Sequence, residues 1–278
     1  MKHETYIPVL QREPQVKAGE LTTSGALGRG IQILQAFTTA TPELNAHELM
    51  AATGLPRPTL FRLSSMLCQA GLLRYDKLTG RFQPAPGLAR LASPLMARVH
   101  IRQLAFGSMQ ALADRVRGQV SLGLGTGPDL VFIELAQAKE CETVRPAMDS
   151  HISLSRTAKG RAYLAALPPD QGQRYVETML ANDPEHGAWL VERMSEARRD
   201  LAERGFCVSQ GDLHRQLDAV AVPVRSNSTD KIYVFGCTVP SFELRPRQLV
   251  EEVGPRLVTM VRSIGAAMGI PVASHTGE

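Results

Sequence analysis

Residues 53–63 read TGLPRPTLFRL, and this stretch decides the fold of the first part of the chain. A proline disfavours helical geometry in the residue before it, so the two prolines keep the beginning of the segment extended. Pro58 suits the first position of a helix, because its ring fixes φ near the helical value and its missing N–H needs no partner there. The stretch therefore predicts a tight turn, followed by a helix from Pro58 to about Ala70 that ends at Gly71.

The predicted helix has two faces of opposite character. At about 100° per residue, its apolar side chains fall in one sector, which we expect to be buried: Leu60, Leu63, Leu67 and Ala70. The opposite side carries Pro58, Phe61, Arg62, Ser65 and Gln69. A helix that only covers a core seldom exposes a phenylalanine beside an arginine, so we expect this face to contact a partner.

The segments on either side complete the order of elements. Upstream, apolar residues at helical spacing predict a helix over residues 26–37. Asn45 and Glu48 then predict a capping box at the start of a second helix, which stops at Gly54. Downstream, residues 72–75 and 81–83 are strand-like and are joined by a polar loop. Helix, helix, turn, helix and basic hairpin is the order of a winged helix-turn-helix.

The charge distribution favours DNA binding by this region. The chain of 278 residues has a net charge of +4, and residues 24–90 hold seven basic and three acidic side chains. The other residues balance, with 24 of each sign. Basic groups that neutralise DNA phosphates release condensed counterions, so a local positive excess suits a DNA-binding surface. Because solvated faces of small domains also carry such an excess, charge alone does not decide the matter.

Composition argues against several other classes of protein. No run approaches the roughly 18 apolar residues that span a bilayer, and the first twenty residues contain no apolar stretch of signal-peptide length. We therefore expect a cytoplasmic protein without membrane contact. The four cysteines lie far apart and form no C-x-x-C pair, which argues against a zinc site or a disulfide framework. We expect neither a metal nor a cofactor.

The larger C-terminal part has an α+β pattern. Alternation predicts strands at residues 120–124, 130–135, 219–224 and 232–239, paired as two hairpins. Helical patterns occupy residues 158–167, 170–180, 188–204 and 246–268. Two hairpins among helices predict a domain built on a largely antiparallel sheet.

Several separated motifs resemble the IclR family of transcription regulators over roughly residues 25–270. They are residues 26–31 (ALGRGI), 53–63, 79–82 (TGRF), 154–162 (LSRTAKGRA), and 205–206 with 221–224. The resemblance implies a GAF-like α+β effector-binding domain after the winged helix-turn-helix. It also implies a homodimer or homotetramer that binds double-stranded DNA at a palindromic or pseudo-palindromic operator.

The expected organisation has five parts. They are a mobile arm at 1–23, the winged helix-turn-helix at 24–86, a linker helix at 87–100, the GAF-like effector-binding domain at 101–270 and a tail at 271–278. The chain also departs from the family pattern. Pro58 and Phe61 stand where the family often has a small polar residue and a histidine, and Ser155 replaces the usual histidine. Ala219 and Gly236 stand where relatives often offer a cysteine and a serine, so we expect an unusual effector site.

The third helix supplies the predicted base contacts. Side chains near the start of a recognition helix read base edges, whereas flanking basic groups hold phosphates. We expect Arg57, Thr59 and Arg62 to make the main contacts with the DNA. Phe61 is expected to contact a thymine methyl, and Ser65 a base or a phosphate. Phosphate contacts are assigned to Arg29, Lys77 and Arg81. The full predicted set is Arg29, Arg57, Pro58, Thr59, Phe61, Arg62, Ser65, Lys77 and Arg81.

Thr157 marks a predicted helix start that suits an anion. Its hydroxyl is expected to cap the first turn, which is a sufficient structural reason for a threonine. Free amides at a helix start also attract carboxylates. We hypothesise that the acid group of a small effector lies on the amides near Thr157, Ala158 and Gly160. The resemblance implies that Asp212, Ala219, Gly236 and Thr238 line the rest of the site.

Two other functions stay open from the sequence. The chain could be an enzyme or ligand-binding protein with a basic accessory domain, or an architectural DNA-binding protein without an effector. No G-x-S-x-G or H-E-x-x-H motif occurs. We therefore favour an effector-controlled regulator and assign no catalytic residue.

Overall fold

The computed structural model describes residues 25–38, 41–97, 100–127, 129–141, 152–226 and 231–269. Contacts divide the chain into two compact units, with the boundary between His100 and Ile101. The predicted arm at 1–23 and the predicted tail at 271–278 lie outside the described residues. Among the described helices, none is both long enough and apolar enough to cross a membrane.

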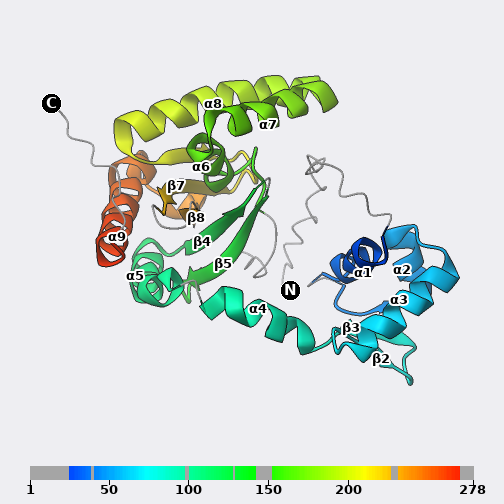
Figure 1. Cartoon of the computed structure of the whole chain (residues 1–278). Helices are drawn as coiled ribbons and strands as arrows, with labels where there is room; N and C mark the ends of the chain where they lie inside the picture. The colour runs from blue at the N-terminus through cyan, green and yellow to red at the C-terminus, as the bar shows by residue number, and fades with distance from the viewer. Residues whose placement is uncertain are drawn as a thin grey trace, which may run out of the picture. The chain divides into compact units, whose positions relative to one another are not determined.

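The first unit combines helices with a small antiparallel sheet (Figure 1). Its elements are α1 (Ala26–Gln35), β1 (Leu44–Asn45), α2 (Ala46–Thr53), α3 (Arg57–Gln69), β2 (Leu73–Asp76), β3 (Arg81–Pro84) and α4 (Gly87–Ala97). Strand β3 lies between β1 and β2, so that Leu44 and Tyr75 both stand opposite Phe82. This is the element order of the predicted winged helix-turn-helix, with β2 and β3 as the wing.

Local signals in the sequence account for the helix ends. Asn45 and Glu48 form the predicted capping box: Asn45 Oδ1 accepts from the Glu48 amide at 2.9 Å, and the Glu48 carboxylate accepts from the Asn45 amide at 2.8 Å. Gly54 ends α2 with a φ of 67°, a left-handed conformation that strains any residue with a side chain. Pro58 lies in the first turn of α3, which begins one residue earlier, at Arg57.

A core of buried apolar side chains fixes α3 in the first unit. It contains Ile33, Leu44, Leu49, Leu55, Leu60, Leu63, Leu73 and Phe82. Each fully buried leucine contributes about 1.5–3 kcal/mol. Leu60 and Leu63 are buried as predicted and Leu67 is half-buried, but the prediction for Ala70 was wrong. Ala70 is exposed because α3 ends at Gln69 and the chain turns away there.

The second unit is built on a five-stranded antiparallel sheet (Figure 1). Its elements are α5 (Ile101–Val116), β4 (Gln119–Thr126), β5 (Asp129–Gln137), α6 (Ala158–Ala166), α7 (Pro169–Asn182), α8 (Pro184–Arg204), β6 (Cys207–Gln210), β7 (Leu217–Arg225), β8 (Ile232–Pro240), η1 (Ser241–Glu243), η2 (Leu249–Val253, a π-helical turn) and α9 (Gly254–Ala267). The strand order is β5-β4-β8-β7-β6, which confirms the predicted antiparallel α+β fold. The edge strand β6 was not predicted.

Helices cover both faces of this sheet. Helices α6, α7 and α8 pack on one face, in a cluster that includes Ala221 and Val234, while α5 and α9 lie against the other (Figure 1). Ser121 on β4, Gly236 on β8 and Ala221 on β7 stand opposite one another in the strand register. This row of small residues lies on the α6 face and leaves room for side chains from the start of α6.

Candidate functional site

The outer face of α3 is exposed, as predicted from its pattern. Pro58, Phe61, Arg62, Ser65 and Gln69 are all exposed, and Phe61 keeps 42% of its surface accessible. The Arg57 guanidinium lies over the Phe61 ring, with Cζ 5.6 Å from the ring centroid. Residues four apart are neighbours on a helix surface, so this cation–π contact holds Arg57 against its own helix. The exposed Phe61 ring therefore has a structural role, because it holds the Arg57 side chain in place.

The predicted phosphate contacts have different environments. Lys77 is exposed in the loop between β2 and β3, and Arg29 is half-buried in the first turn of α1. Arg81 is engaged within the unit: its Nη1 and Nη2 lie 3.0 and 3.2 Å from the Glu48 carboxylate, and Nη1 donates to the Glu43 carbonyl at 3.0 Å. The Asn45 amide, and to a smaller extent Arg81, lower the pKa of Glu48. Arg81 therefore ties the wing to α2 and is not a free cation.

The tip of the wing carries an apolar side chain that was not predicted to be part of the site. Leu78 is 97% exposed, and its amide donates to Asp76 Oδ1 at 2.8 Å. Gly80 closes the loop with a φ of 67°. An apolar side chain at a hairpin tip can gain burial only from a partner, so the tip belongs with α3 to the candidate interface.

The first turn of α6 is capped by Thr157, as predicted. Its Oγ1 accepts from the Gly160 amide at 2.8 Å and donates to the Ser153 carbonyl at 2.7 Å. A Cβ at Gly160 would lie 2.2 Å from that same carbonyl oxygen, so only glycine fits there. Ala158 is buried. Because the Gly160 amide already has an acceptor, less of the hypothesised amide site is available to a ligand.

Arg161, also in α6, is buried in an ion pair with Asp212. Its Nη2 lies 2.7 Å from Asp212 Oδ2, and the two side chains are 1% and 10% exposed. The guanidinium also donates to the carbonyls of Ser155 and Val208 at 2.8 and 3.1 Å, and Ser209 Oγ donates to Asp212 Oδ2 at 2.9 Å. Such charge-assisted bonds need their full set of partners when buried. Asp212, which the family resemblance placed at the effector, is thus held by the protein itself.

Gly236 likewise has a protein neighbour. A Cβ built there would lie 2.5 Å from Cγ and Cδ of Lys159, whose aliphatic chain runs over the glycine. The Lys159 Nζ donates to Ser121 Oγ at 2.5 Å. Ala219 and Thr238 stand opposite each other in the next row of the same face and are only half-buried. Of the four residues that the resemblance implied, Gly236 is buried and the other three are half-buried.

Both parts of the chain match families of known proteins. Residues 26–77 match the IclR helix-turn-helix domain, and residues 94–266 match the family described as bacterial transcriptional regulator IclR C-terminal. The chain belongs to the IclR family. It is 26% identical to the HTH-type transcriptional regulator TsaQ1/TsaQ2 of Comamonas testosteroni, over 87% of this chain and 88% of that protein.

Solved structures of IclR proteins show the same fold. An IclR family transcriptional regulator from Brucella abortus is 34% identical with a TM-score of 0.76, over 88% of this chain and 92% of that one. An IclR homolog from Microbacterium hydrocarbonoxydans, complexed with 4-hydroxybenzoate, is 19% identical with a TM-score of 0.66, over 86% and 100%. The matched domains and relatives are transcription regulators, so the enzyme alternative is set aside. This IclR protein is a DNA-binding transcription regulator with a C-terminal effector-binding domain.

Ser155, where the resemblance leads us to expect a histidine, contacts a histidine from another helix. His186 on α8 places its Nε2 2.9 Å from Ser155 Oγ, and its ring stacks on Trp189 with centroids 5.2 Å apart. Trp189 lies in turn 6.0 Å from Arg161 Cζ and is partly buried against the core. Sequence spacing could not have paired Ser155 with His186, because only the packing of α8 on α6 brings them together.

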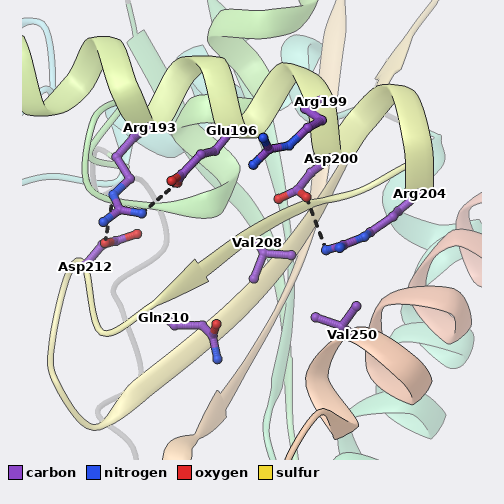
Figure 2. Close-up of a pocket in the computed structure, with 9 residues that line it drawn as sticks. All are labelled: Arg193, Glu196, Arg199, Asp200, Arg204, Val208, Gln210, Asp212 and Val250. Carbon is purple, nitrogen blue, oxygen red and sulfur yellow. Dashed lines mark hydrogen bonds and ion pairs between the residues drawn. The ribbon is translucent and has the colours of Figure 1, made fainter.

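A charged groove between α8 and the edge strand β6 was also not predicted (Figure 2). Its lining residues are Arg193, Glu196, Arg199, Asp200, Arg204, Val208, Gln210, Asp212 and Val250. Arg193 lies 2.6 Å from Glu196 and Arg204 lies 3.2 Å from Asp200, so much of the charge is neutralised within the groove. Arg193 Nε also faces Asp212 Oδ1 at 3.8 Å. Asp212 therefore connects this surface with the buried Arg161, but the alternating signs favour no single class of ligand.

Proposed function

We propose that this IclR regulator binds a palindromic or pseudo-palindromic operator as a homodimer or homotetramer, and that a small organic acid in the second unit changes its DNA affinity. The cytoplasm, where bacterial DNA lies, is the expected location. The exposed face of α3 carries the proposal, because its cationic stack and polar side chains suit a base-reading surface. A two-fold symmetric oligomer presents two copies of this face, which matches an operator of the same symmetry.

In this proposal, α3 lies in the major groove. Arg57 and Arg62 donate to guanine acceptors, while the Phe61 ring orients Arg57 and contacts a thymine methyl. The side chains that flank them on the same helix are Pro58, Thr59 and Ser65. Lys77 on the wing and Arg29 on α1 hold phosphates. Arg81 supports the wing through Glu48.

The effector would lie between the start of α6 and the sheet. The half-buried pair Ala219 and Thr238 supports this location, as does the positive end of the α6 dipole near Thr157 and Ala158. The solved IclR homolog with 4-hydroxybenzoate shows that a member of the fold takes an organic acid. The buried Arg161–Asp212 pair fixes α6 to the β6 end of the sheet, so a ligand beside it acts on a rigid element.

Arg62→Ala tests the DNA-binding surface. Operator fragments are selected from random DNA with the wild-type protein, and affinities are then measured by gel-shift titration. We expect at least a tenfold loss, because one good base contact contributes about 1–3 kcal/mol and each bound subunit loses it. Arg198→Ala, the same change on an exposed part of α8, is the control and should bind normally. Unchanged affinity of a folded Arg62→Ala protein would remove α3 from the interface.

A further inference from the structure

Lys159 is a buried cation at the start of α6. Only 8% of the residue is exposed. Its Nζ donates to Ser121 Oγ on β4 and lies 4.3 Å from the centroid of the Phe132 ring on β5. An ammonium group has three donors, and the hydroxyl accepts one of them.

No carboxylate among the described residues pairs with Lys159, whereas the buried Arg161 does have such a partner, as do Arg193 and Arg204 on α8. Burying an ammonium without a counter-charge is costly, and such a group tends to lose its proton. Burial accordingly lowers the pKa of Lys159 to about 7. Among the residues that the structure describes, this buried cation therefore has no counter-anion.

The sheet provides the room for this arrangement. Gly236 lies beneath the aliphatic chain of Lys159, where any Cβ would collide with it. Ser121 and Ala221, its neighbours across the strands, are also small. In the next row of the same face, Ala219 and Thr238 are half-buried, so this face of the sheet is less covered there than at Ala221 and Gly236.

We propose that the Lys159 ammonium binds the carboxylate of the effector and thereby makes this chain selective for small organic acids. The inference rests on the proposed function, because it names the residue that receives the effector's acid group. The ligand carboxylate replaces the missing counter-charge, while the rest of the molecule lies over Ala219 and Thr238. The amides near Thr157 then have a secondary role, since the Gly160 amide is already used by the cap.

In this proposal the protein takes up a proton when the ligand binds, because the ligand carboxylate forms an ion pair with the Lys159 ammonium. The carboxylate stabilises the charged form of Lys159, so above pH 7 the ligand draws a proton onto Nζ, approaching about one proton per ligand near pH 8. Two neighbouring groups bear on this proton: the Arg161–Asp212 ion pair, in which a cation faces an anion, and the Cys237 thiol on β8, which interacts with the Lys159 charge. Burial raises the pKa of Cys237 to about 12, so this thiol does not titrate in that range.

Calorimetric titration of the full-length protein tests the proposal. Benzoate, 4-hydroxybenzoate and pyruvate are titrated at pH 8 in two buffers of different ionisation enthalpy, which reports proton uptake. We expect at least one acid to bind with proton uptake and its neutral amide not to bind. Lys159→Met should lower the affinity for that acid at least tenfold and abolish the proton uptake. Gly236→Ala, which crowds the aliphatic chain of Lys159, should lower the affinity for the acid while leaving the ammonium charge in place.

Lys139→Met, at an exposed lysine that follows β5, is the matched control and should bind like the wild type. Binding without proton uptake, equal binding by Lys159→Met, or no binding of any of the acids at millimolar concentration would overturn the inference. Operator release by a neutral compound would overturn it too, while leaving the proposed function intact. Absence of operator binding by the wild type would instead contradict the proposed function.

Discussion

Lys159 contributes to the pH dependence of the stability of the second unit. Its pKa is about 7 when folded and near 10.4 in an unfolded chain, so the unfolded state binds more protons between these values. The contribution of Lys159 to the stability of the wild type therefore rises with pH in this window, by up to about 1.4 kcal/mol per pH unit. Below pH 7 the full cost of burying the cation is present. Replacing it with an apolar side chain of similar length removes this cost.

We expect Lys159→Met to be more stable than the wild type by roughly 1–4 kcal/mol at pH 6. The difference should shrink as pH rises from 7 to 10. Urea unfolding at several pH values measures it, with Lys139→Met as the exposed control. A loss of stability in Lys159→Met at every pH would mean that the Ser121 hydrogen bond and the Phe132 contact outweigh the buried charge.

The environment of some residues could be predicted from the sequence, and that of others could not. The exposed face of α3 could be predicted because helical geometry alone assigns Phe61 and Arg62 to one side. The burial of Lys159 could not, because it depends on the missing side chain at Gly236, far along the chain. Asp212 could be associated with the second unit by resemblance, but its pairing with Arg161 appears only when β6 packs on α6.

The capping box of α2 links helix formation to the wing. Asn45 pairs with Arg81 in the β1–β3 register, and Glu48 both completes the cap and binds the Arg81 guanidinium. Losing the Asn45 side chain should therefore cost the usual value for an N-cap, about 1 kcal/mol. It should also loosen the start of α2, where the Glu48 amide loses its acceptor.

Asn45→Ala is the variant that tests this link. We expect the free energy of unfolding of the first unit to fall by about 1 kcal/mol and the Glu48 amide to exchange hydrogen faster. Asn45→Ser keeps a capping oxygen and should restore most of the loss. Equal protection of the Glu48 amide in Asn45→Ala and the wild type would show that the β1–β3 pairing alone holds this helix start.

Elements with strong local signals were predicted well, and those without them were missed. Prolines, glycines and the capping box marked the ends of α2 and α3, and alternation marked β4, β5, β7 and β8. Strands β1 and β6 were missed because each is short, with two and four residues, and exists only through pairing with its neighbour. The π-helical turn η2 before α9 has no pattern of its own in the sequence.

At the scale of the whole chain, two units are joined through α4. The Gly87 amide at the start of α4 donates to the Gly71 carbonyl at 3.0 Å, and a Cβ at Gly87 would lie 2.2 Å from that oxygen. The first turn of α4 is thus fixed to the DNA-binding unit. The sequence predicted a linker helix here. The close contact between Gly87 and Gly71 could be recognised only in the folded structure.

The number of DNA-binding units on one operator can be read from salt dependence. The slope of log affinity against log salt is about −0.9 per neutralised phosphate on duplex DNA. Lys77→Ala removes one proposed phosphate contact per subunit, so its slope should be weaker by about 1.8 if two subunits bind and by about 0.9 if one does. We expect about 1.8 for the proposed dimer on a palindromic operator. Fluorescence anisotropy over a series of potassium chloride concentrations measures the slopes, with Arg198→Ala matching the wild type. A change near 0.9 would contradict two-fold binding, and no change would remove Lys77 from the interface.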